Sequence, residues 1–219
     1  MARPGERATF HPGVIVDGAD AVRKQVRTNV KYGADQIKIV ATGGILSVGD
    51  AVGAAQFGMD ELTAAVAEAT RLGRKVMAHA HAGDGLKAAV LAGVASIEHG
   101  SLVDDEAIGF MKQKGTYLVP TLIILEEIVT DGVRKGVPAN SIAKATAIAV
   151  DRRARLRAAY KAGVKFALGT DATSDIHGRN GEEFKYMVDI LGATPMEAIT
   201  VGTMNGVPSE NVTPPVALL

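Results

Sequence analysis

The sequence predicts an α/β fold built on a parallel sheet, and two observations lead to that prediction. Short runs rich in β-branched residues alternate with longer stretches of helical spacing along the chain. The β-like runs are apolar throughout, as is typical of strands that are covered on both faces. Rossmann-type sheets, flavodoxin-type sheets and a (β/α)8 barrel all fit this alternation, so the pattern alone leaves the three open.

The first half of the chain contains three predicted strands separated by helices. Gly33 and Gly73 follow stretches of helical spacing, where glycine commonly ends a helix. Asp60 and Glu61 lie in a predicted first turn, where acidic side chains suit the helix dipole. The Gly-rich connection is long for a βα loop, which favours a functional role. The predicted elements are helix 17–32, strand 36–41, loop 43–58, helix 59–72, strand 75–79, helix 83–93 and strand 95–99.

The second half continues the alternation with two more predicted strands. Pro120 marks the end of one of them, because proline has no N–H to donate to a sheet ladder. The long apolar-periodic stretch between the two strands predicts one extended helix. The predicted elements are helix 104–115, strand 116–122, helix 140–162, strand 164–171 and helices at about 181–191 and 194–204, with irregular tails at 1–16 and 206–219.

Composition narrows the class of protein. The 219 residues are 47% hydrophobic, and 24 basic residues balance 24 acidic ones, so nothing indicates a nucleic-acid or membrane partner. Cysteine is absent, which excludes disulfides and thiolate metal sites within this chain. No apolar run has the length of a membrane span, and the first residues lack a signal-peptide core. The default expectation is a cytoplasmic protein.

Polar residues follow or interrupt four of the predicted strands. His79, His99 and Asp171 stand at the ends of three strands, and Lys38 lies within an earlier one. Sites in α/β sheets form at the carboxyl ends of strands, so these side chains are expected to converge. Each alone has a structural reading: a hydrogen-bonded histidine, or an aspartate that caps a helix. A buried lysine needs a partner, a lowered pKa or a modification. Together the four residues predict a divalent-metal site.

Two further histidines allow either interpretation. His81 follows His79 in an H-A-H pattern, which puts both imidazoles on one side if the strand continues. His177 lies in a Gly-flanked loop after Asp171. Either residue is equally well read as a substrate contact or as an ordinary loop residue.

Several segments together resemble the amidohydrolase superfamily. They are GADQIKIVATGGILS, KVMAHAHAGDGLKAAVLAGVASIEHGS, GTYLVPTL and KFALGTDA, and the similarity runs from about Val14 to Asn205. The branch that the chain resembles is imidazolonepropionase-like and includes Xaa-Pro dipeptidases and related carboxypeptidases. The resemblance implies a (β/α)8 TIM barrel, of which this chain would hold strands four to eight with their helices.

The resemblance also implies roles for the metal-site residues. Lys38 resembles a carboxylated lysine that bridges two metals, and His79 and His99 resemble the ligands of the next two strands. Asp171 resembles the last-strand aspartate that is both metal ligand and general base. His79, rather than His81, is the expected ligand. Two Zn²⁺ ions are expected in a full-length site, and other divalent metals are compatible with the same ligands.

The implied reaction is hydrolysis of a peptide or amide bond by a metal-activated hydroxide. A dipeptide, as in Xaa-Pro dipeptidases, or an N-acyl amino acid is the expected small-molecule substrate. Asp171 would orient the hydroxide and carry its proton to the leaving amine. Candidate substrate-binding residues are His81, Tyr117, Thr121, His177 and Arg179, the last of them for a carboxylate.

The sequence also departs from the family pattern. The strand-one H-x-H, the strands before the Lys38 strand and the flanking β-sandwich have no counterpart in it. Residues 1–219 are therefore expected to form a single incomplete barrel domain, with weak or no activity by itself. Its unpaired edges predict aggregation, poor stability or a homo-oligomer. Two alternatives remain: a mononuclear cyclic-amide hydrolase, against which Lys38 argues, and a non-catalytic fragment.

Overall fold

A computed structural model describes residues 14–173 and 176–206 of the chain. Five parallel strands form one sheet in the order β1-β2-β3-β4-β5, so neighbours in sequence are neighbours in space. The strands are β1 (Gln36–Val40), β2 (Lys75–Ala80), β3 (Ser96–His99), β4 (Tyr117–Val119) and β5 (Lys165–Phe166). The predicted parallel α/β sheet is confirmed.

Helices connect the strands and follow the last of them. Gly93 and Gly115 adopt the left-handed conformation directly after two of these helices, where a side chain would be strained. The helices are α1 (Ala19–Lys31), α2 (Met59–Arg71), α3 (Gly83–Ala92), α4 (Asp105–Lys114), α5 (Leu122–Asp131), α6 (Ala139–Lys161), α7 (Glu182–Tyr186) and α8 (Pro195–Gly202), with a π-helix at Met187–Leu191 and a 3-10 turn at Met204–Gly206.

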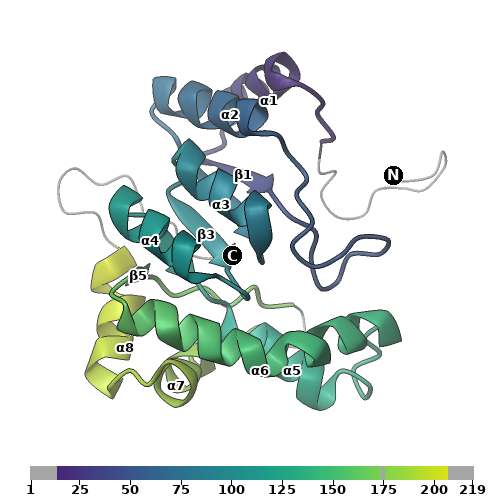
Figure 1. The fold of residues 1–219 in the computed structure, drawn as a ribbon, viewed down its shortest axis with the longest axis vertical. Helices are drawn as coiled ribbons and strands as arrows, with labels where there is room; N and C mark the ends of the chain where they lie inside the picture. Colours follow the sequence, from purple (N-terminus) through teal and green to yellow (C-terminus); the bar gives the residue numbers. More distant parts are fainter. Residues whose placement is uncertain (1–13, 174–175, 207–219) are drawn as a thin grey trace.

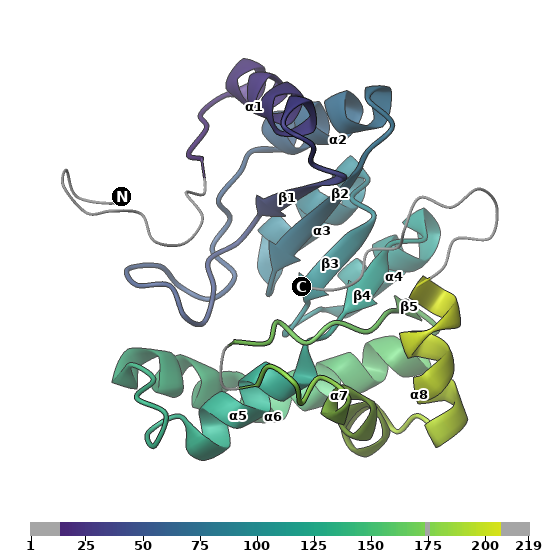
Figure 2. The same ribbon diagram turned by 180° about the vertical axis from the view of Figure 1, so that it is seen from behind.

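The main core lies between the sheet and the helices on one of its faces. Figure 1 shows α1 to α4 over that face, and Figure 2 shows β1 to β3 from the other side with no helix in front of them. In β1, Ile37 and Ile39 are buried whereas Lys38 and Val40 are exposed. The expectation that the strands are covered on both faces is therefore wrong for β1 in the described structure.

A second, smaller core lies beside the sheet. Ile123, Leu125 and Ile128 of α5 pack with Ala145 of α6 and with Ile45 from the loop that follows β1. Both ribbon views show that loop running from β1 toward α5. Apolar contacts thus tie the Gly-rich loop to a helix that lies about 80 residues later in the chain.

The stretch after β4 differs from the prediction. A strand was expected over 116–122, but β4 ends at Val119 and helix α5 begins at Leu122. Pro120 has no N–H for the ladder, and Thr121 turns the chain with a left-handed backbone (φ 45°). Helix α5 was missed, although Leu122, Leu125 and Val129 are spaced as on one helical face.

The last predicted strand is also shorter than expected. Only Lys165–Phe166 of the 164–171 segment pair with β4. The helix expected at 181–191 divides into α7 and the π-helix, and the one at 194–204 corresponds to α8 and the 3-10 turn. Within the predicted tails, residues 14–17 have no regular structure, and residues 1–13 and 207–219 lie outside the described residues.

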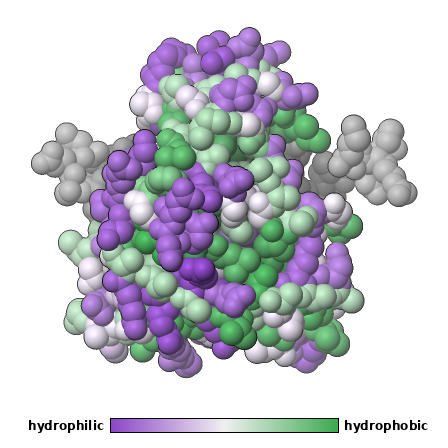
Figure 3. All heavy atoms as spheres, viewed as in Figure 1, coloured by the Kyte–Doolittle hydropathy of each residue, from purple (hydrophilic) through white to green (hydrophobic). Residues whose placement is uncertain are grey.

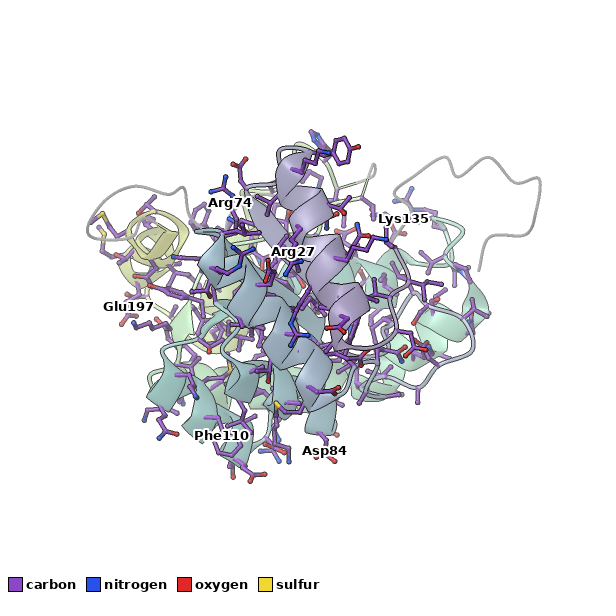
Figure 4. All side chains as sticks on the ribbon, turned by 90° about the horizontal axis from the view of Figure 1, so that it is seen from above. Arg27, Arg74, Asp84, Phe110, Lys135 and Glu197 are labelled. Atoms are coloured by element: carbon purple, nitrogen blue, oxygen red, sulfur yellow. The ribbon has the colours of Figure 1, made fainter. Side chains whose placement is uncertain are left out.

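The outer surface mixes polar and apolar residues. Figure 3 shows this mixture on the helix-covered face. Arg27 of α1 and Arg71 of α2 both bind the carboxylate of Glu68, and Figure 4 shows Arg27 where the two helices lie side by side. Among residues 14–173 and 176–206, no helix is long and apolar enough to cross a membrane.

Candidate metal centre

Three histidines gather at the carboxyl ends of β2 and β3. His79 lies in β2, His81 follows that strand directly, and His99 ends β3. Each offers one imidazole nitrogen, and these three nitrogens lie within 4.8 Å of one another. The ring centroids are 4.6 Å apart for His79 and His99 and 4.8 Å apart for His81 and His99. Such a triad is a suitable set of ligands for one divalent metal.

A local change in backbone conformation accompanies the approach of His99 to the other rings. The sheet register pairs His99 with Ala80, which is fully buried beneath the helices. Regular strand alternation would direct the His99 side chain toward that same covered face. His99 instead has a φ of 73°, and Gly100 has a φ of 53°. This left-handed turn interrupts the strand alternation at His99, so its side chain need not point to the covered face.

Hydroxyl groups form hydrogen bonds with two of the imidazole rings through Nδ1. Nδ1 of His81 lies 2.8 Å from Oγ of Ser101, and Nδ1 of His99 lies 2.7 Å from Oγ1 of Thr121. When Nδ1 donates its proton to the hydroxyl, Nε2 retains the lone pair that a metal requires. Nε2 of His79 is buried and has no hydrogen-bond partner among the described residues. The imidazole nitrogens of the three histidines therefore suit a metal ion as ligands.

The surroundings favour the neutral form of all three rings. Burial lowers the pKa of His79 to about 4, with a further lowering by the nearby Lys38 ammonium. Burial also lowers the pKa of His81 to about 3. The pKa of His99 is lowered in the same direction by burial and by the other two histidines. Neutral imidazoles are the form that binds a metal.

Lys38 and Asp171 belong to the same electrostatic environment. Desolvation lowers the pKa of the Lys38 ammonium, and the negative charges of Glu98 and Asp171 oppose that effect. Burial raises the pKa of Asp171, against the influence of Lys38. Lys38 was expected in a buried strand, but the residue is exposed on the open face of β1. The atoms around its ammonium nevertheless partly desolvate it.

A cleft of about 210 Å³ opens above the histidines. One wall is the loop after β1, and the other is one face of α5. Lys144 of α6 fastens the loop by donating to the carbonyl oxygens of Gly44 and Ser47 and to Asp50. The lining consists of Val40, Gly44, Ile45, Leu46, Ser47, Asp50, His79, His81, His99, Ile124, Leu125, Ile128 and Asp171.

The other predicted binding residues do not line this cleft. Tyr117 begins β4, where it pairs in register with Ser96 and Lys165, at the opposite end of the strands from the histidines. His177 is exposed. Arg179 already binds the carboxylates of Glu127 and Glu182. Thr121 does not line the cleft either, but its hydroxyl contacts His99, which does.

Other residues of the site had no place in the sequence prediction. Glu98 is buried beside Lys38 and accepts a hydrogen bond from Ser96, and burial raises its pKa. A carboxylate inside the predicted strand 95–99 was the signal that could have identified it. Ser101 and Lys144 carry no comparable signal, because their roles depend on contacts between distant segments.

Known proteins resemble this chain in sequence and identify its family. The Amidohydrolase family matches residues 2–214. Ochratoxinase from Aspergillus niger is 39% identical over 194 residues, which cover 89% of this chain and 40% of that protein. The chain thus spans less than half the length of this curated relative.

Solved structures agree with the sequence comparison. The crystal structure of A. niger ochratoxinase matches 87% of this chain and 43% of its own, with a TM-score of 0.78 and 39% identity. A Xaa-Pro dipeptidase with bound methionine in its active site matches 92% of this chain and 51% of its own, with a TM-score of 0.80 and 39% identity. The resemblance drawn from the sequence motifs is confirmed: the chain belongs to the amidohydrolase family.

Proposed function

We propose that the protein contributes the metal-binding half of a hydrolase that cleaves a peptide or amide bond. The observation that supports this most directly is the histidine triad at the base of a cleft, with one buried imidazole nitrogen that has no partner among the described residues. Membership of the amidohydrolase family agrees with hydrolysis of a C–N bond.

The residues proposed to hold metal are Lys38, His79, His99 and Asp171, and the geometry adds His81 to them. A divalent metal, with Zn²⁺ as the first candidate, would supply a Lewis acid that polarises the substrate carbonyl and activates water. A lowered pKa increases the neutral fraction of the Lys38 amine, which is the form that reacts with CO₂ to give a carbamate. We therefore propose that Lys38 is carboxylated in a two-metal site.

Asp171 is proposed as the group that moves a proton. Its carboxylate lines the cleft, and its raised pKa brings it closer to neutral pH, which suits a general base. In this role Asp171 would take a proton from water and transfer it to the leaving amine. Asp171 has a left-handed backbone (φ 49°) on the segment without regular structure that follows β5.

The proposed substrate is a dipeptide of Xaa-Pro type or an N-acyl amino acid. The names of the relatives support this class, since they include a Xaa-Pro dipeptidase and an ochratoxinase. The five strands are proposed to correspond to strands four to eight of a (β/α)8 barrel, as one incomplete domain. A cytoplasmic location and a homo-oligomer remain part of the proposal.

Hydrolysis assays with Xaa-Pro dipeptides and N-acyl amino acids in the presence of Zn²⁺ test this function, with the chain assayed as part of the proposed complete barrel. Lys38→Ala and Asp171→Asn are expected to lower the hydrolysis rate by at least roughly a hundredfold. The exposed residues Lys112 and Asp84 provide matched controls, so Lys112→Ala and Asp84→Asn should leave the rate unchanged. Full activity in both site variants would contradict the proposal.

Metal analysis and intact-mass measurement separate the two hydrolase types. Two metals per full-length site and a mass increase for a carboxylated lysine, absent in Lys38→Ala, are expected. One metal per chain with an unmodified Lys38 would favour the mononuclear cyclic-amide hydrolase. A chain that binds no metal would favour the non-catalytic alternative.

A further inference from the structure

Helix α5 receives its N-terminal cap from a distant part of the chain. Thr121 occupies the N-cap position, but its side chain makes no capping hydrogen bond. The two carboxylate oxygens of Glu183 accept instead from the backbone N–H groups of Leu122 (2.6 Å) and Ile123 (2.9 Å). Glu183 belongs to α7 and is fully buried. It therefore satisfies helix donors that a local threonine or serine usually satisfies.

Because Glu183 caps the helix in place of Thr121, the Thr121 hydroxyl is available for another hydrogen bond. A threonine at an N-cap ordinarily turns its oxygen back toward the helix. Here Oγ1 of Thr121 lies 2.7 Å from Nδ1 of His99 on the neighbouring strand end. The Glu183 carboxylate thus binds the two residues that directly follow Thr121, and Thr121 itself contacts the His99 imidazole.

A buried arginine fixes the same turn from the other side. Nη2 of Arg152 donates to the carbonyl oxygens of Pro120 (3.0 Å) and Thr121 (3.2 Å). Arg152 is 1% exposed, although it lies on α6. Thr121 has a φ of 45°, which a β-branched residue adopts only where its surroundings impose it. Glu183 and Arg152 supply such surroundings.

We propose that Glu183 and Arg152 are positioning residues that hold Thr121 in its left-handed conformation, and through it fix the ring orientation and tautomer of His99. The inference rests on the proposed metal site, in which His99 is a ligand. Neither residue touches substrate or metal in this role. Partners of a ligating histidine typically change metal affinity when they are removed.

A thermodynamic cycle tests whether Glu183 acts through Thr121. Co²⁺ affinity of the 219-residue chain is measured by its absorption spectrum for wild type, Glu183→Gln, Thr121→Val and the double variant. Each single variant is expected to weaken Co²⁺ binding roughly ten- to a hundredfold. The double variant should bind no more weakly than Thr121→Val, because the link that Glu183 uses is already absent.

Matched variants provide the controls. Thr121→Ser keeps the hydroxyl and should preserve the affinity, whereas Glu182→Gln changes the neighbouring, partly buried glutamate and should have no effect. An equal loss from Glu183→Gln in the wild-type and Thr121→Val backgrounds would overturn the proposal, and so would no loss at all. If Glu183→Gln does not fold, Arg152→Lys takes its place in the cycle with the same expected outcomes.

A metal-free measurement separates this proposal from the proposed function. The ¹⁵N shifts of His99 report its tautomer without any metal. A single tautomer in the wild-type chain and a mixture in Glu183→Gln and Thr121→Val are expected. An unchanged tautomer in both variants would overturn the positioning role, even if metal binds. A wild-type chain that binds no Co²⁺ but shows the tautomer change would contradict only the metal site.

Discussion

His99 and Thr121 are joined by a 2.7 Å contact between Nδ1 and Oγ1, and both have left-handed backbones with φ values of 73° and 45°. Across residues 14–173 and 176–206, the only other non-glycine residue with positive φ is Asp171. Backbone strain tends to be kept at functional sites, where the surrounding structure imposes it. All three strained residues belong to the proposed metal centre, which gives that site support independent of its side-chain chemistry.

Gly100 is the residue that lets the chain continue after the strained His99. Its φ is 53°, and an added Cβ would lie 2.4 Å from Cδ1 of Leu118, which is fully buried. Gly100→Ala is therefore expected to lower the free energy of unfolding by about 1–3 kcal/mol. Urea denaturation measures the change.

Gly109 in α4 offers the matched control. It has no atom within 4 Å of an added Cβ, and its φ is not positive. Gly109→Ala should stabilise the chain by about 0.5–1 kcal/mol, because alanine loses less entropy in a helix. Equal effects of the two substitutions would contradict the assigned role of Gly100.

Much of the fold was predictable because the signals are local. Glycines such as Gly73 and Gly93 follow helices at the expected positions, and four of the five strands lie within their predicted segments, while β2 runs one residue further, to Ala80. The end of β4 was not predictable in the same way. The apolar run beyond Pro120 suits a strand or a helix, and contacts of α5 with α6 and with Glu183 decide between them.

In the candidate site, too, some residues carry local sequence signals and others depend on contacts between distant segments. His79, His99 and Asp171 were identifiable because each lies at the end of a predicted strand, and all three line the cleft. Thr121 was identified only as a substrate contact, and its bond to His99 depends on a backbone conformation that no local pattern signals. Lys144 reaches a loop 100 residues away in sequence, so its role could not be read from neighbouring residues.

Lys144 gives a prediction about the mobility of the cleft wall. Its ammonium binds two carbonyl oxygens and Asp50 of the loop that follows β1. Lys144→Met removes these bonds, so the loop should open more often. Hydrogen exchange at Gly43, Gly44 and Gly53 is expected to accelerate roughly tenfold. Lys185→Met, at an exposed ion pair with Asp189, should leave the same amides unchanged; unchanged exchange in Lys144→Met would exclude the anchoring role.

Arg152 and Arg153 provide a comparison between a buried and an exposed ion pair. Both bind Glu126, but the Arg152 side chain is 1% exposed and that of Arg153 is 51% exposed. Arg152→Met removes the donor to the carbonyl oxygens of Pro120 and Thr121 and one of the two arginine partners of buried Glu126, so it should lower the free energy of unfolding by about 3–5 kcal/mol. Arg153→Met should cost at most about 1 kcal/mol. Thermal and urea unfolding distinguish the two, and similar losses would contradict the buried network.

Glu183 makes the stability of the fold depend on pH. Burial raises its pKa from an ordinary 4.5 to about 7, against the opposing effects of the Ile123 and Leu122 N–H groups and Arg152. Between these two values the folded protein retains a proton that the unfolded chain has released. Stability from this group is therefore complete below pH 4.5 and declines as the pH rises to about 7.

Other groups titrate over the same range, so the measurement compares wild type with Glu183→Gln. The difference in unfolding free energy between the two proteins should change by about 2–3 kcal/mol from pH 4.5 to pH 7, with wild type losing stability relative to the variant. Glu182→Gln is the control, because that carboxylate lies on the same turn and is only partly buried, in an ion pair with Arg179. Urea midpoints at both pH values provide the data. Parallel curves for wild type and Glu183→Gln would show that Glu183 has the same pKa in the folded and unfolded chains.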